Sequence, residues 1–386
     1  MNSGEITGLL YTSNRAVRLR WEKGVISALE ETRPPSGAEA WICPAALDLQ
    51  VNGYAGVDFQ QDGLTEGDLL RAATGLRAAG CGRFLLTLIT DEWEQMLERI
   101  RHLRRLRLSS PALQRAIAGW HLEGPFLSSQ AGFCGAHRPE LMRDPSPKQV
   151  AALREATGAD PVLLTLAPER PGALEAIREA VVSGMKVSLG HTDASSQVLR
   201  AAIAAGATGF THFANACPQQ LDRHDNILWR VLDTSGLTVS LIPDGYHVSP
   251  ALFRLAHRVF NREAIYYTTD AVSAAGAGPG RYTVGPHQVD VGPDQIVRQP
   301  GKTNFAGSGL RPLDGAFRAG AILGQSWREV WDWLSVSPAR FMGWPHGLGV
   351  GAPADVTLIE MNGGQPGRVR TWVRGEELSL PVRAKP

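Results

Sequence analysis

The sequence predicts an α/β fold, a (β/α)8 TIM barrel that carries a small β-sandwich domain formed by the N- and C-terminal segments. Apolar strand-like runs alternate with helical stretches from residue 47 onward, which is typical of a parallel sheet. Eight such runs are present, and eight repeats predict a closed barrel. The chain has 386 residues, 43% of them hydrophobic, which is enough for one large barrel and a small second unit.

The expected barrel elements follow from the hydrophobic period and from residues that start and stop helices. Helix 65–79 has Thr65 as its N-cap and ends at Gly80, and helix 92–106 repeats apolar residues at helical spacing. Further helices are expected at 147–156, 171–182, 195–205 and 250–260. The eight expected strands are 47–51, 83–89, 115–121, 161–166, 186–189, 209–212, 237–242 and 265–269. An open doubly wound sheet is the alternative, but no Gly-x-Gly-x-x-Gly motif follows the first strand.

The two ends of the chain read as strands. Strands are expected at 6–11, 16–21, 24–29, 354–359 and 368–374, and the two ends are expected to pair with each other. Residues 280–304 predict an inserted hairpin, followed by helices at 313–323 and 327–334. We therefore expect residues 1–46 and 346–386 to form the small β-domain and residues 47–345 to form the barrel.

Composition and charge exclude several classes of protein. The formal net charge is +1, which argues against nonspecific binding of nucleic acid. The four cysteines are scattered and form no Cys-x-x-Cys pair, as in a chain kept in a reducing cytosol. No apolar run reaches the roughly 20 residues of a membrane span, and the first residues do not resemble a signal peptide. We expect a cytoplasmic protein without a membrane or nucleic-acid partner.

Polar side chains follow most of the predicted barrel strands, where barrel enzymes place their chemistry. These groups lie at 50–52, 121–123, 190–193, 211–215, 244–247 and 268–270. Glu123, His191 and His212 form a His2Glu set, which leaves a fourth position open as catalytic zinc sites do. Each histidine taken singly is more often a structural residue. His121 lies two residues before Glu123 on the same strand face and is an alternative ligand.

Other residues at this rim are candidates for acid–base chemistry and for anion binding. Asp270 follows the last strand and is placed to move a proton between water and a leaving amine, or to cap the next segment. His137 lies on the loop after Glu123 and is either an oxyanion donor or an ordinary loop residue. Arg223 and His247 are candidates for holding an anion, although Arg223 belongs to a charged run that fits a solvated surface equally well.

These residues occur in a series of motifs that resembles the N-acetylglucosamine-6-phosphate deacetylases, a family of the amidohydrolase superfamily. The matching stretches keep the family's order between about residues 44 and 345: 44–53, His121-Leu122-Glu123-Gly124-Pro125-Phe126, 135–137, Gly190-His191-Thr192, 211–216, 244–248, 269–271, 275–276 and 337–340. Jointly the motifs are specific, although each tripeptide is weak alone.

The resemblance implies roles for individual residues. Glu123, His191 and His212 would hold one divalent metal ion, for which zinc is expected and iron, cobalt and manganese are open. Asp270 would be the catalytic acid/base and His137 would hold the substrate carbonyl. The substrate, a phosphorylated N-acetyl amino sugar, would contact Ala136, Asn215, Ala216, Arg223, His247, Phe305, Ala306 and Gly307. A phosphate contact from a neighbouring subunit implies a homodimer.

The chain departs from the family pattern at three places. Gln50 and Asn52 stand where two-metal members of the superfamily have His-x-His, which favours one metal. The loop at 133–136 lacks a lysine that is common in the family, and the segment 217–230 matches loosely. The expected activity is metal-dependent removal of the N-acetyl group of N-acetylglucosamine-6-phosphate in amino-sugar catabolism. The alternatives are an amidohydrolase acting on N-acetylgalactosamine-6-phosphate or another amide, and a non-catalytic barrel.

Overall fold

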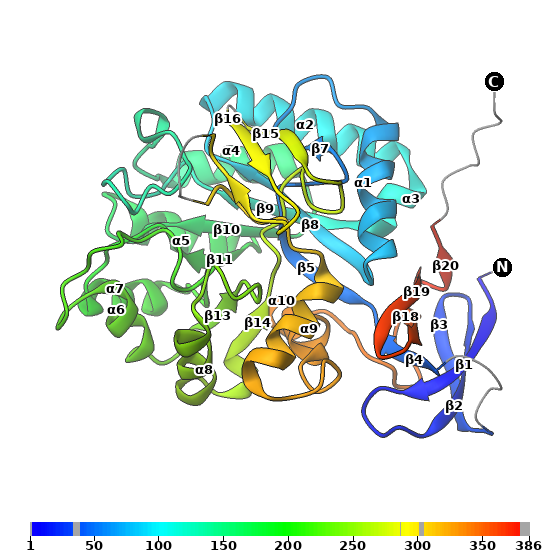
Figure 1. Cartoon of the computed structure of the whole chain (residues 1–386). Helices are drawn as coiled ribbons and strands as arrows, with labels where there is room; N and C mark the ends of the chain where they lie inside the picture. The colour runs from blue at the N-terminus through cyan, green and yellow to red at the C-terminus, as the bar shows by residue number, and fades with distance from the viewer. Residues whose placement is uncertain (1, 34–38, 286, 301–304, 379–386) are drawn as a thin grey trace.

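A computed structural model describes residues 2–33, 39–285, 287–300 and 305–378, and it contains the predicted barrel (Figure 1). Eight strands form one sheet in the order β14-β13-β12-β11-β10-β9-β8-β5, and all neighbouring pairs in it are parallel. They are β5 (Ala46–Val51), β8 (Cys81–Ile89), β9 (Ile117–Glu123), β10 (Val162–Leu166), β11 (Lys186–Leu189), β12 (Gly209–Phe210), β13 (Thr238–Leu241) and β14 (Ile265–Tyr267). The (β/α)8 prediction is confirmed.

The barrel closes between β14 and β5 by side chains and isolated backbone contacts. Val51 forms a single bridge with Ala271, and the Asn52 amide donates to the Ala271 carbonyl at 2.7 Å. The buried carboxylate of Asp48 spans the same seam, where it accepts hydrogen bonds from Thr268 and Thr269. The first and last barrel strands are therefore joined mainly by one aspartate and the residues that follow β14.

Helices surround the sheet, and most of them were foreseen. They are α1 (Glu66–Ala78), α2 (Trp93–Ser109), α3 (Pro111–Ala116), α4 (Pro147–Thr157), α5 (Ala173–Val182), α6 (Ser196–Ala205), α7 (Ile227–Leu232), α8 (Pro250–Val259), α9 (Pro312–Leu323) and α10 (Val336–Met342). Thr65 is the predicted N-cap of α1, in a reciprocal capping box with Asp68. Helix α5 begins later than predicted because Gly172 takes a left-handed conformation, with φ of 80°.

The predicted helix over 327–334 is wrong. The chain there makes turns and one short 3-10 helix, Trp331–Trp333. Trp331 is fully buried, and its indole N–H donates to the Pro44 carbonyl at 2.8 Å. The spacing of the apolar residues resembled that of a helix. It instead reflects tryptophans that pack near the N-terminal ends of the barrel strands, where Pro44 precedes β5.

Strands from both ends of the chain form one seven-stranded sheet in the order β20-β19-β18-β4-β1-β2-β3, seen in blue and red in Figure 1. They are β1 (Gly4–Leu10), β2 (Ala16–Glu22), β3 (Val25–Glu31), β4 (Glu39–Pro44), β18 (Val356–Asn362), β19 (Gln365–Val373) and β20 (Glu376–Glu377). Strand β4, which the sequence reading missed, pairs antiparallel with β18 and parallel with β1. It is the link through which the predicted pairing of the two ends occurs, whereas the exact domain boundaries stay predictions.

Short strands lie around the barrel mouth. β6 (Gly53–Tyr54) pairs with β7 (Val57–Asp58), and the predicted insertion forms β15 (Gly280–Val284), β16 (His287–Val291) and β17 (Val297–Arg298). The Gly285 amide donates to the Asp58 carboxylate at 2.7 Å, and a His287 ring nitrogen lies 3.2 Å from the Ala136 carbonyl. These contacts fasten the inserted hairpin to the loops that follow β5 and β9.

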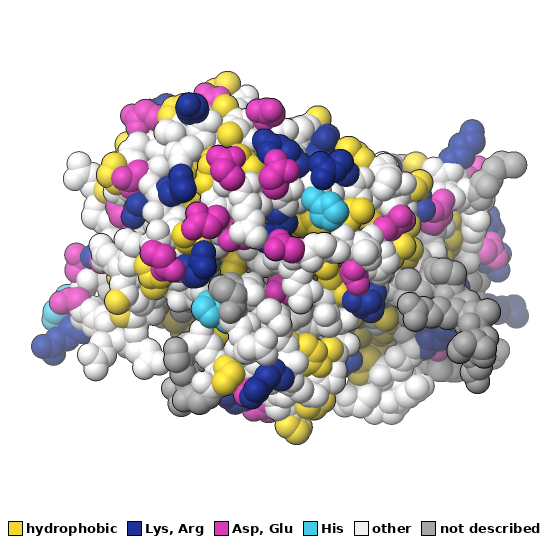
Figure 2. Space-filling model, turned by 90° about the horizontal axis from the view of Figure 1, so that it is seen from above, with side chains coloured by type: hydrophobic (Ala, Val, Ile, Leu, Met, Phe, Trp, Pro, Cys, Tyr) yellow, Lys and Arg dark blue, Asp and Glu magenta, His cyan; other side chains and the backbone are white. Residues whose placement is uncertain are grey.

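The surface carries both signs of charge. Figure 2 shows basic and acidic side chains interspersed over the face it presents, as expected for a formal net charge of +1. In the described part of the chain, no helix combines the length and apolar character needed to cross a membrane.

Candidate active site and metal centre

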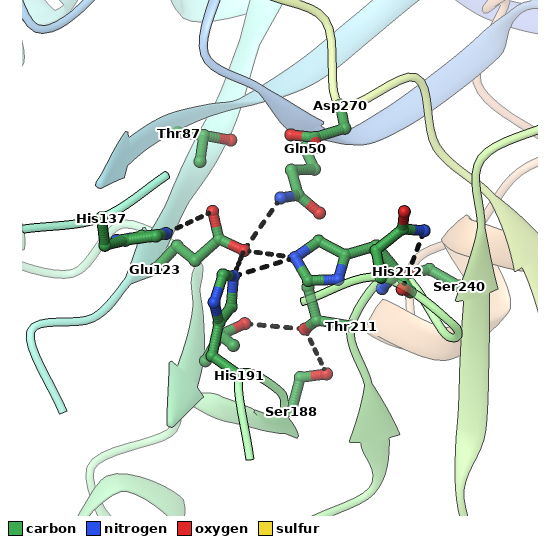
Figure 3. Close-up of polar contacts among 12 residues, drawn as sticks. Gln50, Thr87, Glu123, His137, Ser188, His191, Thr211, His212, Ser240 and Asp270 are labelled. Carbon is green, nitrogen blue, oxygen red and sulfur yellow. Dashed lines mark hydrogen bonds and ion pairs between the residues drawn. The ribbon is translucent and has the colours of Figure 1, made fainter. Parts of the chain in front are cut away.

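Three buried side chains converge at the carboxyl ends of barrel strands on one side of the barrel. Glu123 is the last residue of β9, His191 follows β11 and His212 follows β12, and their ligand atoms all lie within 4.8 Å of one another (Figure 3). Glu123 Oε1 is 2.8 Å from His212 Nε2 and 3.2 Å from His191 Nε2. Both histidines have positive φ, an uncommon conformation that turns each side chain inward where the strand ends.

The protonation of Glu123 and His191 suits a metal ion, whereas the negative charge of Glu123 raises the pKa of His212, so an incoming cation would replace the proton of that ring. Burial alone would raise the pKa of Glu123, but its contacts with the surrounding histidines, among them His137 and His212, hold it well below its usual range. Burial lowers the pKa of His191 to about 4, so the ring is neutral. His191 Nδ1 donates to the Phe133 carbonyl at 2.9 Å, which leaves the Nε2 lone pair facing Glu123 and His212. Two imidazole nitrogens and a carboxylate oxygen therefore converge as ligands for a cation.

His121, the alternative ligand, lies outside this cluster. Its Nε2 is 2.7 Å from the hydroxyl of Thr165, within the barrel interior. Burial lowers the pKa of His121 to about 4, so it packs as a neutral ring. His121 and Glu123 both face the barrel interior, but only Glu123 lies close enough to His191 and His212 to share a metal ion with them.

The two amides that replace His-x-His act as hydrogen-bond donors to carboxylates. Gln50 Nε2 donates to Glu123 Oε1 at 3.1 Å, and Asn52 Nδ2 donates to Asp270 Oδ1 at 2.7 Å. A side-chain N–H that faces a carboxylate cannot at the same time be a metal ligand. The pair therefore directs Glu123 and Asp270 through its two amide nitrogens, which in this orientation are not available to a second metal ion.

Asp270 follows β14 and faces the metal-ligand cluster. Its φ of 51° turns it toward the cavity, as at His191 and His212. Burial raises the pKa of Asp270 well above the ordinary value, and the negative charge of Glu123 acts in the same direction. A carboxylate with a raised pKa can take and return a proton near neutral pH.

His137 reaches the same cluster from the loop after β9. The backbone N–H of Thr90 donates to His137 Nδ1 at 3.3 Å, and the Thr90 hydroxyl lies 2.8 Å from the same nitrogen. Because a backbone N–H can only donate, Nδ1 accepts and the neutral ring carries its proton on Nε2. Nε2 lies 3.6 Å from Glu123 Oε2, so this N–H faces the centre. The sequence reading named His137 but missed Thr90, which no local motif marks.

A cavity of about 610 Å³ opens above these residues. Besides Glu123, His191 and His212 it is lined by His137 and Asp270 and by most of the predicted substrate-binding residues, namely Ala136, Asn215, Ala216, His247, Phe305, Ala306 and Gly307. Arg223 is exposed and lies outside this lining. Asn52, which was expected at this rim without a role, also lines the cavity, as do Cys217 and Gln219, which were not predicted to do so.

His247 is held by a residue to which the sequence reading gave no role. Asp244 Oδ2 accepts from His247 Nδ1 at 2.6 Å, and both side chains are largely buried. Only the spacing Asp-x-x-His in the segment after β13 signals this contact. The ring of Phe305 lies 5.0 Å from the ring of His247, measured between centroids.

Comparisons with known proteins agree with the geometry. No family model matches the chain. An N-acetylgalactosamine-6-phosphate deacetylase of Escherichia coli O157:H7 is 32% identical over 94% of this chain and 95% of its own length, and an N-acetylglucosamine-6-phosphate deacetylase of Danio rerio is 33% identical over 83% and 80%. The structure of the Mycobacterium smegmatis N-acetyl-D-glucosamine-6-phosphate deacetylase in complex with N-acetyl-D-glucosamine-6-phosphate is 31% identical, with a TM-score of 0.85 over 98% of this chain and 100% of that one. The chain is a hydrolase acting on amides and belongs to the N-acetylglucosamine-6-phosphate deacetylase family of the amidohydrolase superfamily.

Proposed function

We propose that this enzyme hydrolyses the N-acetyl group of N-acetylglucosamine-6-phosphate, giving glucosamine-6-phosphate and acetate in amino-sugar catabolism. The convergence of Glu123, His191 and His212 beneath a cavity that also holds Asp270 and His137 carries this proposal. A scaffold barrel has no use for five titratable side chains gathered at one mouth, because burying them costs free energy.

One divalent metal ion is the cofactor, with Glu123, His191 and His212 as its ligands. Zinc fits a His2Glu set with an open fourth position, and metal analysis of the purified protein distinguishes it from iron, cobalt and manganese. When bound, such an ion polarises the amide carbonyl and lowers the pKa of water. The hydrogen bonds of Gln50 and Asn52 to carboxylates support a single ion.

The chain's own residues supply the proton transfers and the oxyanion contact. Asp270 takes a proton from the attacking water and delivers it to the nitrogen of the departing amine, which its raised pKa favours. The Nε2–H group of His137 donates a hydrogen bond to the substrate carbonyl oxygen as negative charge develops there. Asn52 holds the Asp270 carboxylate so that its second oxygen is free for the water.

The remaining cavity residues bind the phosphorylated sugar. Ala136, Asn215, Ala216, Ala306 and Gly307 line the space for the sugar, with Phe305 at its edge and His247 as the phosphate contact. Arg223 is exposed and lies outside the cavity of its own chain. This position is suited to a residue that contacts the phosphate bound in a second copy of the chain. We therefore propose a homodimer in which Arg223 completes the partner's site.

The four cysteines are all free, which fits the proposed cytoplasmic location.

Acetate release tests the proposed function. The metal-loaded enzyme should hydrolyse N-acetylglucosamine-6-phosphate much faster than unphosphorylated N-acetylglucosamine. The second candidate is N-acetylgalactosamine-6-phosphate, because the E. coli O157:H7 relative that aligns over 94% of this chain is a deacetylase of that sugar phosphate. A higher kcat/KM on the galacto epimer would assign the enzyme to that substrate, and no hydrolysis of either would refute the proposal.

A further inference from the structure

We propose that Asp244 is a positioning residue for phosphate recognition, which fixes His247 and supplies the charge that lets its ring meet a phosphate as a cation. This inference rests on the proposed function, because it assumes that His247 contacts the substrate's phosphate. Asp244 follows β13 and lies behind His247, so it acts through that ring and does not line the large cavity itself.

The first step is the geometry of the pair. Asp244 Oδ2 lies 2.6 Å from His247 Nδ1, while Asp244 Oδ1 accepts the backbone N–H groups of Tyr246 and His247, both at 2.9 Å. One carboxylate oxygen of Asp244 therefore holds the loop backbone, and the other holds the His247 ring. The Nδ1 edge faces Asp244, and His247 is part of the cavity lining.

The second step is the surroundings that hold the pair. The loop is fastened from α9, where Arg318 Nη1 donates to the Asp244 carbonyl at 3.3 Å and its guanidinium lies 5.5 Å from the centre of the Tyr246 ring. The ring of Phe305 lies against the His247 ring, tilted by 44° with 5.0 Å between the centroids. Burial alone would raise the pKa of Asp244, but the hydrogen bonds from His247 and the loop lower it overall, so the carboxylate is ionised.

The third step is what a phosphate requires. A ring whose Nδ1 proton is donated to Asp244 can donate to a phosphate oxygen only if Nε2 also carries a proton. The ring is then a cation between two anions, and Asp244 stabilises it through a charge-assisted hydrogen bond. The pair thus makes phosphate binding depend on a carboxylate that never touches the substrate.

Replacing Asp244 by asparagine removes the negative charge beside His247 but keeps an oxygen that can accept the two loop N–H groups. In Asp244→Asn the two loop N–H groups hold the amide oxygen, so the amide N–H faces Nδ1 and favours a neutral ring protonated at Nε2. We expect KM for N-acetylglucosamine-6-phosphate to rise about 10- to 100-fold, the range for loss of a charge-assisted hydrogen bond. Competitive inhibition by inorganic phosphate should weaken by a similar factor. The kcat for the phosphorylated sugar and the kcat/KM for unphosphorylated N-acetylglucosamine should stay within about threefold.

Two further variants complete the experiment. Asp314→Asn is the matched control, because Asp314 lines the same small cavity behind His247 but is bonded to Arg311 and should change none of these values. Asp244→Ser keeps an acceptor for the loop N–H groups without reaching Nδ1, and should reproduce the selective rise in KM. It provides the test if the asparagine variant does not fold.

The outcomes separate the inference from the function on which it rests. If the unchanged enzyme does not prefer the phosphorylated sugar, the phosphate site itself is refuted. If His247→Gln abolishes that preference while both Asp244 variants retain it, Asp244 has no positioning role. Equal losses on the phosphorylated and unphosphorylated sugars in both Asp244 variants would show a structural role only and overturn the inference.

Discussion

Replacing Asp48 by alanine should weaken the closure of the barrel. The buried carboxylate of Asp48 accepts hydrogen bonds from the backbone N–H groups of Gln50 and Thr269, at 3.2 and 3.1 Å, and from the hydroxyls of Thr268 and Thr269. Because β5 and β14 form no ladder within the described residues, the bonds from Thr268 and Thr269 are, with the backbone bonds to Ala271, the main link across the seam. Alanine would leave buried donors without partners.

The expected magnitude follows from those donors. The hydroxyls can rotate to other acceptors, such as the Gln50 carbonyl 3.5 Å from Thr268 Oγ1, but the two backbone N–H groups cannot. Each unsatisfied buried group costs about 1–3 kcal/mol. Burial raises the pKa of Asp48, so alanine also removes the cost of burying a charge. We expect a net loss of about 3 kcal/mol in the free energy of unfolding at pH 7.

Urea denaturation followed by tryptophan fluorescence measures this loss as the shift in midpoint multiplied by the slope. The matched control is Asp290→Ala, which removes an exposed ion pair with Arg281 and should change stability by less than about 0.5 kcal/mol. Because the seam also carries Asp270, kcat should fall in Asp48→Ala at unchanged metal content. A loss of stability no larger than that of the control would refute the assigned role of Asp48.

Three further outcomes are expected. Glu123→Gln should purify with little metal, since the amide is a poor ligand, and elemental analysis showing a full complement would exclude Glu123 as a ligand. Asp270→Asn should abolish turnover while metal stays bound, and loss of the metal would instead make Asp270 chiefly a ligand. Burial lowers the pKa of His257 to about 4, whereas the unfolded chain binds a proton near 6.5. The folded state should therefore lose stability as pH falls from 6.5 toward 4, by at most about 3 kcal/mol from this residue. In His257→Gln, which keeps an acceptor for the Tyr267 hydroxyl, urea midpoints at pH 7.5 and 5 should lie closer together, and an unchanged pH dependence would contradict the reasoning.

The candidate site could be predicted in outline because parallel strands end at the same side of a barrel. A polar residue after an apolar run was enough to place Glu123, His191 and His212 together, although they are far apart in the sequence. The choice between Glu123 and His121 could not be made this way. Both face inward at a spacing of two residues, and only the stagger of the strands decides which one reaches the other ligands.

Contacts between loops were beyond the sequence. Arg223 lies in a segment without periodicity, so nothing local indicates whether it points into the cavity or toward solvent. The pairing of Thr90 with His137 joins two loops 47 residues apart. The short helices α3 and α7 span fewer than two turns, which is too few for an apolar period to appear, and their packing is set by the finished barrel.

The most direct test of the single-metal active site is a titration of the metal-free enzyme with zinc, followed by acetate release from N-acetylglucosamine-6-phosphate. If Glu123, His191 and His212 hold the only catalytic ion, activity should rise linearly and reach its plateau at one equivalent per chain. A plateau reached only at two equivalents, or full activity in the metal-free enzyme, would contradict the account.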